Sequence, residues 1–93
     1  MKIVRSQRYT NALQVILRFI SIDSKSRALT FKKELDTHIN DLDYMPYKFR
    51  RSHYFDDENM RDLIFKGYTI VYKIDTEKEC ITIVGIKNTN QGF

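Results

Sequence analysis

The side chains in this sequence that could do chemistry are mainly cations, and the first group of them follows Pro46. This group consists of Lys48, Arg50, Arg51 and His53. Lysine and arginine bind phosphate oxygens or carboxylates, and histidine is a common general acid in proteins, so His53 could act as one. A purely local alternative is that these cations stay solvated or pair with the acids that follow them, Asp56, Asp57 and Glu58.

The second group of cations lies in the last third of the chain. Its members are Arg61, Lys73 and Lys87. Within residues 68–74 large residues alternate with smaller or polar ones, and this period of two places Lys73 on the less apolar face of a strand. We predict that the three cations form one small patch that a partner can reach. Arg61 has a structural alternative, because it could pair with a nearby carboxylate such as Asp62.

Three aromatic residues have the chemistry to stack on nucleic-acid bases. Tyr68 and Tyr72 share one strand face, where they alternate with Ile70 and Ile74. This alternation predicts that both tyrosines lie mostly in the core, with their hydroxyl groups at its edge. Phe93 closes the polar tail KNTNQGF, where it could stack on a base but could not transfer a proton.

The composition is that of a small basic globular protein. The 93 residues are 42% apolar and carry a formal net charge of +4, so we expect one domain, residues 1–93, with a single core. The positive charge favours an acidic partner, which could be a nucleic acid, an acidic protein segment or an acidic protein surface. The single cysteine, Cys80, provides neither a disulfide framework nor a metal cluster, and we expect no metal and no cofactor. No run reaches the roughly 18 apolar residues of a membrane span and no leader is recognisable, so we expect a cytoplasmic protein without a membrane partner.

The first half of the chain has the pattern of a strand followed by two helices. Residues 2–5 are a short strand candidate, and Ser6 can cap a helix over residues 7–22, where apolar residues recur at helical spacing. Asp23 and Ser24 interrupt this pattern and can cap a second helix. Its apolar stripe consists of Ala28, Phe31, Leu35, Ile39 and Leu42. The very short connection predicts a helix hairpin.

The second half changes to the period of strands. Pro46 disfavours helical geometry in the residue before it, and residues 44–58 are predicted to be an irregular connection. Strands are predicted at 60–65, 68–74 and 80–87, with a turn at Gly67 and a polar turn over 75–79. The predicted fold class is α+β: a short N-terminal strand, a two-helix hairpin and three antiparallel C-terminal strands in a twisted sheet.

This order of elements resembles the RelE/ParE superfamily of bacterial toxins over nearly the whole chain. The most specific part of the match is the run MRDLIFKGYTIVYKID together with the final isoleucine-rich strand; the helical stripe agrees but is generic. The resemblance implies a toxin of a type II toxin-antitoxin module, with growth inhibition and plasmid stabilisation as its biological effects. It also implies a cognate antitoxin whose extended C-terminal segment wraps the toxin and neutralises it.

The superfamily contains two mechanisms, which require different residues. RelE-like members cleave messenger RNA in the ribosome, which needs a base, a proton donor and fixed cations around the phosphate. The candidates for these roles are Arg61, Lys73, Lys87 and His53, but the tail lacks the arginines and the histidine or tyrosine that active relatives carry there. ParE-like members bind and poison DNA gyrase without a cleavage set.

We therefore favour gyrase binding over RNA cleavage, and leave an enzymatic activity open. A third alternative is a degenerate relative that keeps the fold and the antitoxin but is no longer toxic. The residues expected to contact a partner or a nucleic acid are Lys48, Arg50, Arg51, Arg61, Lys73, Lys87 and Phe93.

Overall fold

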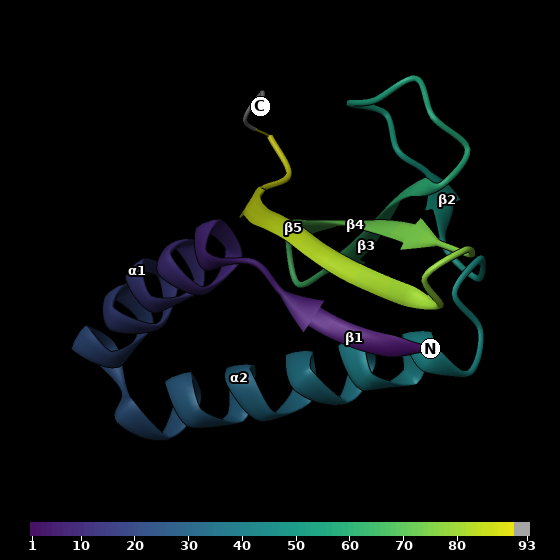
Figure 1. Cartoon of the computed structure of the whole chain (residues 1–93). Coiled ribbons are helices and arrows are strands. Elements are labelled where there is room, and N and C mark those ends of the chain that lie inside the picture. Colours follow the sequence, from purple (N-terminus) through teal and green to yellow (C-terminus); the bar gives the residue numbers. More distant parts are fainter. Residues whose placement is uncertain (91–93) are drawn as a thin grey trace.

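The computed structural model describes residues 1–90, which form one five-stranded sheet with two helices packed on one of its faces (Figure 1). The helices are α1 (Gln7–Asp23) and α2 (Lys25–Asn40). The strands are β1 (Lys2–Arg5), β2 (Arg50–Arg51), β3 (Met60–Phe65), β4 (Tyr68–Asp75) and β5 (Cys80–Asn88). Their spatial order is β1-β5-β4-β3-β2, in which β1 runs parallel to β5 and the other pairs are antiparallel. The predicted α+β class and order of elements are confirmed.

The helix hairpin is organised by two serine caps. The hydroxyl oxygen of Ser6 accepts a hydrogen bond from the Tyr9 amide at 3.0 Å, and that of Ser24 accepts one from the Arg27 amide at 3.2 Å. Ser24 also ends α1, because its own amide donates to the Ile20 carbonyl at 3.1 Å while its backbone is extended. One residue therefore separates the helices. In the described part of the chain, neither of them combines the length and the apolar character that crossing a membrane requires.

The core lies between the helix pair and the sheet. The predicted stripe of α2 is buried, although Leu42 lies in a short 3-10 turn (Asp41–Asp43) beyond the helix end. Tyr9 and Leu13 are the buried residues of α1. The sheet contributes Leu63, Phe65, Ile70, Tyr72, Ile74, Ile81, Ile83 and Ile86 to the same cluster. Each large aliphatic side chain buried here stabilises the fold by about 1.5–3 kcal/mol relative to exposure, before the entropy of ordering is subtracted.

The start of α1 is tied to an irregularity in β5. The register between β4 and β5 shifts after Val71, which pairs with Gly85, whereas Tyr72 pairs with Ile83, so that Val84 is an extra residue. Such a bulge bends its strand. Ser6 donates its amide to the Ile83 carbonyl at 3.0 Å and its hydroxyl to the Val84 carbonyl at 2.8 Å. The parallel pairing of β1 with β5 and these two bonds place the first turn of α1 at the bulge.

The connection after Pro46 is more ordered than the sequence predicted. Arg50 and Arg51 form the edge strand β2, which pairs with Asp62 and Arg61 of β3. The prediction that residues 44–58 are wholly irregular is therefore wrong at these two positions. A strand of two residues is too short to produce an alternating pattern, so periodicity could not reveal it.

Candidate functional site

The three cations predicted to form one patch lie on two different faces of the sheet. In the register, Arg61 pairs with Tyr72, while Lys73 pairs with Met60 and with Thr82. Since paired residues point to the same side, Arg61 belongs to the face that carries the helices, and Lys73 belongs to the other face. The prediction of a single patch is therefore wrong. Which residues of two neighbouring strands share a face depends on the register in which the strands pair. The sequence alone did not reveal that register.

Arg61 holds the connection between η1 (Asp41–Asp43) and β3 in place. Its Nε donates to the Glu58 carbonyl at 2.9 Å, and its Nη1 donates to the Phe49 carbonyl at 3.1 Å. Its guanidinium carbon lies 4.9 Å from the centre of the Tyr47 ring, a cation–π distance. Arg61 thus contacts both ends of the segment that carries the first group of cations, through backbone carbonyls and not through the carboxylate predicted as its alternative partner.

Tyr72 of β4 also holds the connection between η1 and β3 in place. It is fully buried, as predicted for a core residue, and its hydroxyl donates to the Pro46 carbonyl at 2.7 Å. Burial raises the pKa of Tyr72 to about 12, against an opposing effect of the nearby Arg61 charge. The hydroxyl therefore remains protonated at neutral pH and keeps its role as a donor. Tyr68 is half-buried and packs edge-on against Phe31, with ring centres 5.6 Å apart, so neither tyrosine is a stacking platform.

The face opposite the helices is covered over much of its area. Thr69 and Val71 are 0% exposed, so the face is closed around them. Residues 52–59 form a loop that rises above this side of the sheet (Figure 1). The Nζ atom of Lys87 is enclosed there and lies 4.2 Å from the centre of the Tyr54 ring. Lys73 remains exposed on this face.

Asp62 anchors this loop to the sheet. Its side chain is 0% exposed, and its Oδ2 accepts hydrogen bonds from the His53 amide at 3.1 Å and from Nη2 of Arg50 at 3.4 Å. Its Oδ1 makes no hydrogen bond to any residue among 1–90. An ionised carboxylate is expensive to bury without partners, so these contacts determine where the loop starts. Sequence reasoning missed this role, although an aspartate inside the apolar run MRDLIF was a usable signal.

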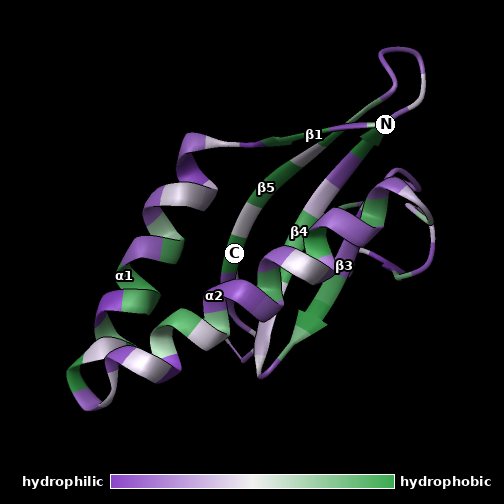
Figure 2. Ribbon diagram, turned by 90° about the horizontal axis from the view of Figure 1, so that it is seen from below, coloured by the Kyte–Doolittle hydropathy of each residue, from purple (hydrophilic) through white to green (hydrophobic). Residues whose placement is uncertain are grey.

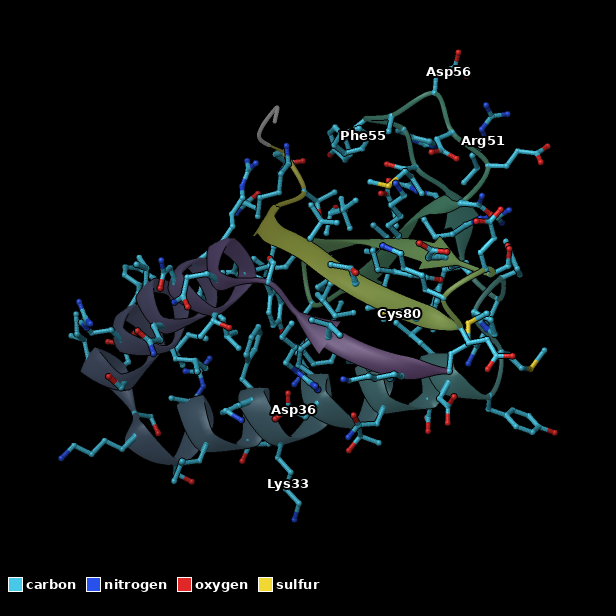
Figure 3. All side chains as sticks on the ribbon, in the orientation of Figure 1. Lys33, Asp36, Arg51, Phe55, Asp56 and Cys80 are labelled. Carbon is cyan, nitrogen blue, oxygen red and sulfur yellow. The ribbon has the colours of Figure 1, made fainter. Side chains whose placement is uncertain are left out.

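The remaining cations of the first group lie at the surface. Arg51 of β2 pairs with Asp56 of the loop at 2.7 Å, and Figure 3 shows the two side chains close together. Lys48 lies 5.4 Å from the centre of the Phe49 ring, and the side chain of His53 is exposed. The local-pairing alternative is confirmed for Arg51, and Arg50 also has a carboxylate partner. Phe93 lies outside the described residues.

The candidate catalytic groups do not converge in the part of the chain that the structure describes. Arg61 lies on one face of the sheet, and Lys73 and Lys87 lie on the other, where Tyr54 stacks on Lys87. Within residues 1–90, moreover, His, Cys, Asp and Glu side chains nowhere gather in a group of three that could hold a metal ion. In this part of the chain, the side chains between sheet and loop therefore make structural contacts. The candidate acid and base groups are not brought together at one point.

The helix pair offers a different kind of surface. Phe19 and Ile22 of α1 are 71% and 79% exposed, and Val15 lies one turn before Phe19 on the same stripe. These residues widen the apolar face of α1 beyond the side that packs on the core. Exposed apolar side chains that cluster in this way typically mark an interaction site.

Comparison with known proteins agrees with the geometry. A family model described as the ParE toxin of the type II toxin-antitoxin system parDE matches residues 3–93. This chain belongs to the ParE toxin family. Membership confirms the resemblance and favours the ParE-like branch; it makes the chain a toxin of a type II system, with an antitoxin as the partner class.

A solved structure supports the ParE fold independently. The chromosomal ParDE toxin-antitoxin system from P. aeruginosa contains a chain that matches with a TM-score of 0.76 over 97% of both chains. The sequence identity is 12%, so this similarity concerns the fold. No curated protein matches this ParE-family chain in sequence.

Proposed function

We propose that this ParE-family toxin inhibits growth by binding DNA gyrase, and that a cognate antitoxin neutralises it. The observation that carries the proposal is the separation of the candidate catalytic cations. RNA cleavage needs an acid, a base and cations around one phosphate, whereas Arg61 and Lys73 project from opposite faces of the sheet. A toxin that acts by binding requires no such set.

The contact surface in this proposal is the helix pair. The exposed stripe formed by Val15, Phe19 and Ile22 provides apolar area, and exposed apolar clusters of this kind typically mark protein-binding sites. The net charge of +4 assists association with an acidic surface.

The test is to induce the chain in cells and to examine both DNA and messages. Gyrase poisoning predicts double-strand breaks and an SOS response, and purified gyrase should lose supercoiling activity when the protein is added. Cleaved messages with intact DNA would instead establish the RelE-like alternative. An absence of any growth defect would establish a non-toxic relative.

One substitution tests whether the helix pair is the surface that contacts gyrase. Phe19→Glu places a charge in the exposed stripe and should raise the concentration needed for gyrase inhibition by about tenfold or more, as expected for an interface anchor. Tyr44→Glu is the matched control, because Tyr44 is an exposed aromatic residue outside both helices. Equal inhibition by wild type and by folded Phe19→Glu would exclude the stripe as the contact.

A further inference from the structure

The net charge of the protein is concentrated at one end of the molecule. We call this region the hairpin end; it consists of residues 15–34, around the connection of the helices, and residues 64–69, around the turn between β3 and β4. It contains six cationic and two acidic residues, whereas the rest of the chain contains ten of each, so it accounts for the whole formal charge of +4. Its cations are Arg18, Lys25, Arg27, Lys32, Lys33 and Lys66. Figure 2 shows the connection of the helices at the end of the molecule away from the N-terminus.

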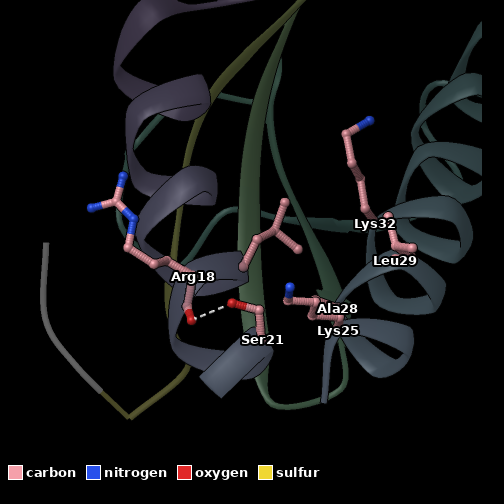
Figure 4. A pocket seen from close by; sticks show the side chains of 7 residues that line it. Arg18, Ser21, Lys25, Ala28, Leu29 and Lys32 are labelled. Atoms are coloured by element: carbon pink, nitrogen blue, oxygen red, sulfur yellow. Dashed lines mark hydrogen bonds between the residues drawn. The ribbon is translucent and has the colours of Figure 1, made fainter. Parts of the chain in front are cut away.

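The start of α2 is the most electropositive part of the hairpin end. Figure 4 shows Arg18 and Lys25 beside the connection, on opposite helices. Lys25 and Arg27 lie in the first turn of α2, and residues 25–28 contain no acid. The positive end of a helix dipole lies at the N-terminus, where anions are favourable and cations are not. The sequence therefore adds two positive side chains to a positive helix end, and an anionic partner would offset this repulsion.

Beside this first turn is a hollow of about 350 Å³ whose polar groups suit a phosphate. Arg27 lines it from α2, and Lys66 lines it from the turn between β3 and β4. The hydroxyl-bearing residues Ser26 and Thr30 lie in the same wall, and none of the described residues that line the hollow is acidic. Arginine, lysine, serine and threonine side chains are among those that contact phosphate oxygens of nucleic acids.

The donors of this hollow remain available to a ligand. In the described part of the chain, the hydroxyl groups of Ser26 and Thr30 make no hydrogen bond. They differ in this respect from Thr37 of the same helix, whose hydroxyl donates to a backbone carbonyl one turn earlier at 3.0 Å. Lys66 is held in place by Glu34, with its Nζ 2.8 Å from Oε2, and an ammonium group has three N–H bonds to donate.

The exposed apolar stripe of α1 lies at the same end of the molecule. Phe19 and Ile22 belong to the stripe, and Ile20, which lies between them in the sequence, lines the hollow that contains Arg27. A gyrase molecule that contacts the stripe would therefore lie beside the cationic hollow. Gyrase acts on DNA, and a DNA backbone presents phosphates without any cation, so it matches a surface on which cations and hydroxyls exceed acids.

We propose that the hairpin end is a surface that binds the DNA backbone, that it contacts the DNA held by gyrase, and that one phosphate occupies the hollow between Arg27 and Lys66. The guanidinium of Arg27 and the ammonium of Lys66 donate to the phosphate oxygens, and the hydroxyls of Ser26 and Thr30 add two further donors. Backbone phosphates are the same in every DNA sequence, so binding is independent of sequence and weakens as salt is raised. That gyrase holds this DNA rests on the proposed function.

The first test measures binding of the full chain to a short labelled DNA duplex by fluorescence anisotropy at several salt concentrations. The wild type should bind with a dissociation constant on the order of 10⁻⁶–10⁻⁴ M, as is typical of binding through phosphates alone. Arg27→Gln combined with Lys66→Gln should raise this constant about tenfold and lower the slope of log affinity against log salt by about 2, because two phosphate contacts are lost.

The matched control is Lys2→Gln combined with Lys78→Gln, which has the same net charge. Both lysines are exposed and lie outside the hairpin end, so the dissociation constant should change by less than about twofold. Thermal melting followed by circular dichroism shows that each variant is folded. Wild-type affinity and salt dependence in the folded Arg27→Gln, Lys66→Gln variant would overturn the proposal. An equal loss in the control would also overturn it, because attraction would then depend on net charge and not on the hairpin end.

Binding to gyrase with and without DNA separates this proposal from the proposed function. DNA should raise the affinity of the wild type for gyrase about tenfold, because the second contact becomes intramolecular, and the Arg27→Gln, Lys66→Gln variant should lose that gain. A variant that keeps the full gain contradicts the proposal. A loss of the same size with and without DNA also contradicts it, and would place an acidic surface of gyrase at the hairpin end. A chain that binds DNA through Arg27 and Lys66 but does not bind gyrase would contradict the proposed function and leave the DNA-binding surface established.

Discussion

The two faces of the sheet are closed by different physical means. On the helix side, a continuous apolar cluster packs α1 and α2 against the strands, and residues such as Leu35 and Ile39 are 0% exposed. On the opposite side, a polar loop is attached through the Asp62 carboxylate, with Tyr54 stacked on Lys87. Apolar packing is distributed over many contacts, whereas the loop depends on a few polar ones. We therefore predict that the helix side determines the stability of the fold, and that the loop determines which cations a partner can contact.

The largest effect should come from a cavity on the helix side. Leu35→Ala removes a fully buried side chain and should lower the free energy of unfolding by about 2–5 kcal/mol. Leu29→Ala on the same helix is the control, because Leu29 is mostly exposed and its loss should change the free energy by less than about 0.5 kcal/mol. Urea unfolding followed by circular dichroism measures both. Similar losses for the two variants would show that the core does not lie where the burial places it.

Alkaline pH should weaken the helix side next. Tyr9 and Tyr72 have pKa values raised from 10.0 to about 12, in both cases chiefly by burial. The folded state therefore binds these protons more tightly than the unfolded state. Stability is fully present below pH 10 and falls as the pH rises from 10 toward 12, by an amount on the order of 2 kcal/mol for each tyrosine.

The control for this pH dependence is the double variant Tyr9→Phe with Tyr72→Phe. It retains every other ionisable group, so the difference between variant and wild type isolates the two tyrosines. Unfolding free energies at pH 8, 10 and 11.5 are the measurement. Parallel curves for the two proteins would contradict the assignment of the pH dependence to buried hydroxyls.

A substitution on the loop side should lower the stability of the whole protein less, but should increase the local opening of the loop more. Asp62→Ala removes the acceptor of the His53 amide and of Arg50, and should cost about 1–2 kcal/mol of stability. Amide hydrogen exchange of residues 52–59 should accelerate much more than that of α2, because the loop loses its anchor. Asp56→Ala is the control, since Asp56 is an exposed partner of Arg51 and should change little. Unchanged exchange in the loop after Asp62→Ala would show that other contacts hold it.

The elements that the sequence predicted correctly are those with local signals. The stripes of both helices, the serine caps and the turn at Gly67 depend on residues close together in the chain. Lys66 and Gly67 both have positive φ, 48° and 83°, which suits a two-residue hairpin turn. The tyrosines of β4 were also placed correctly, because their alternation with isoleucine lies within one strand.

The errors at the candidate site arose from relations between strands. Lys73 was assigned correctly to the face opposite Tyr72, but Arg61 was grouped with it because the register of β3 against β4 was unknown. The edge strand β2 was missed because it is only two residues long. Asp62 was considered only as a partner of Arg61, whereas the fold makes it the anchor of the loop.

The sequence by itself determined the order of elements, the apolar sides of the helices and the resemblance to the RelE/ParE superfamily. These properties follow from periodicity and capping, which act over a few residues along the chain. Only the tertiary structure decided which cations share a face, because a shift of one residue in strand pairing turns every side chain to the other side. The same holds for the hollow lined by Arg5, Tyr9 and Lys32, because β1, α1 and α2 bring these residues together from distant parts of the chain.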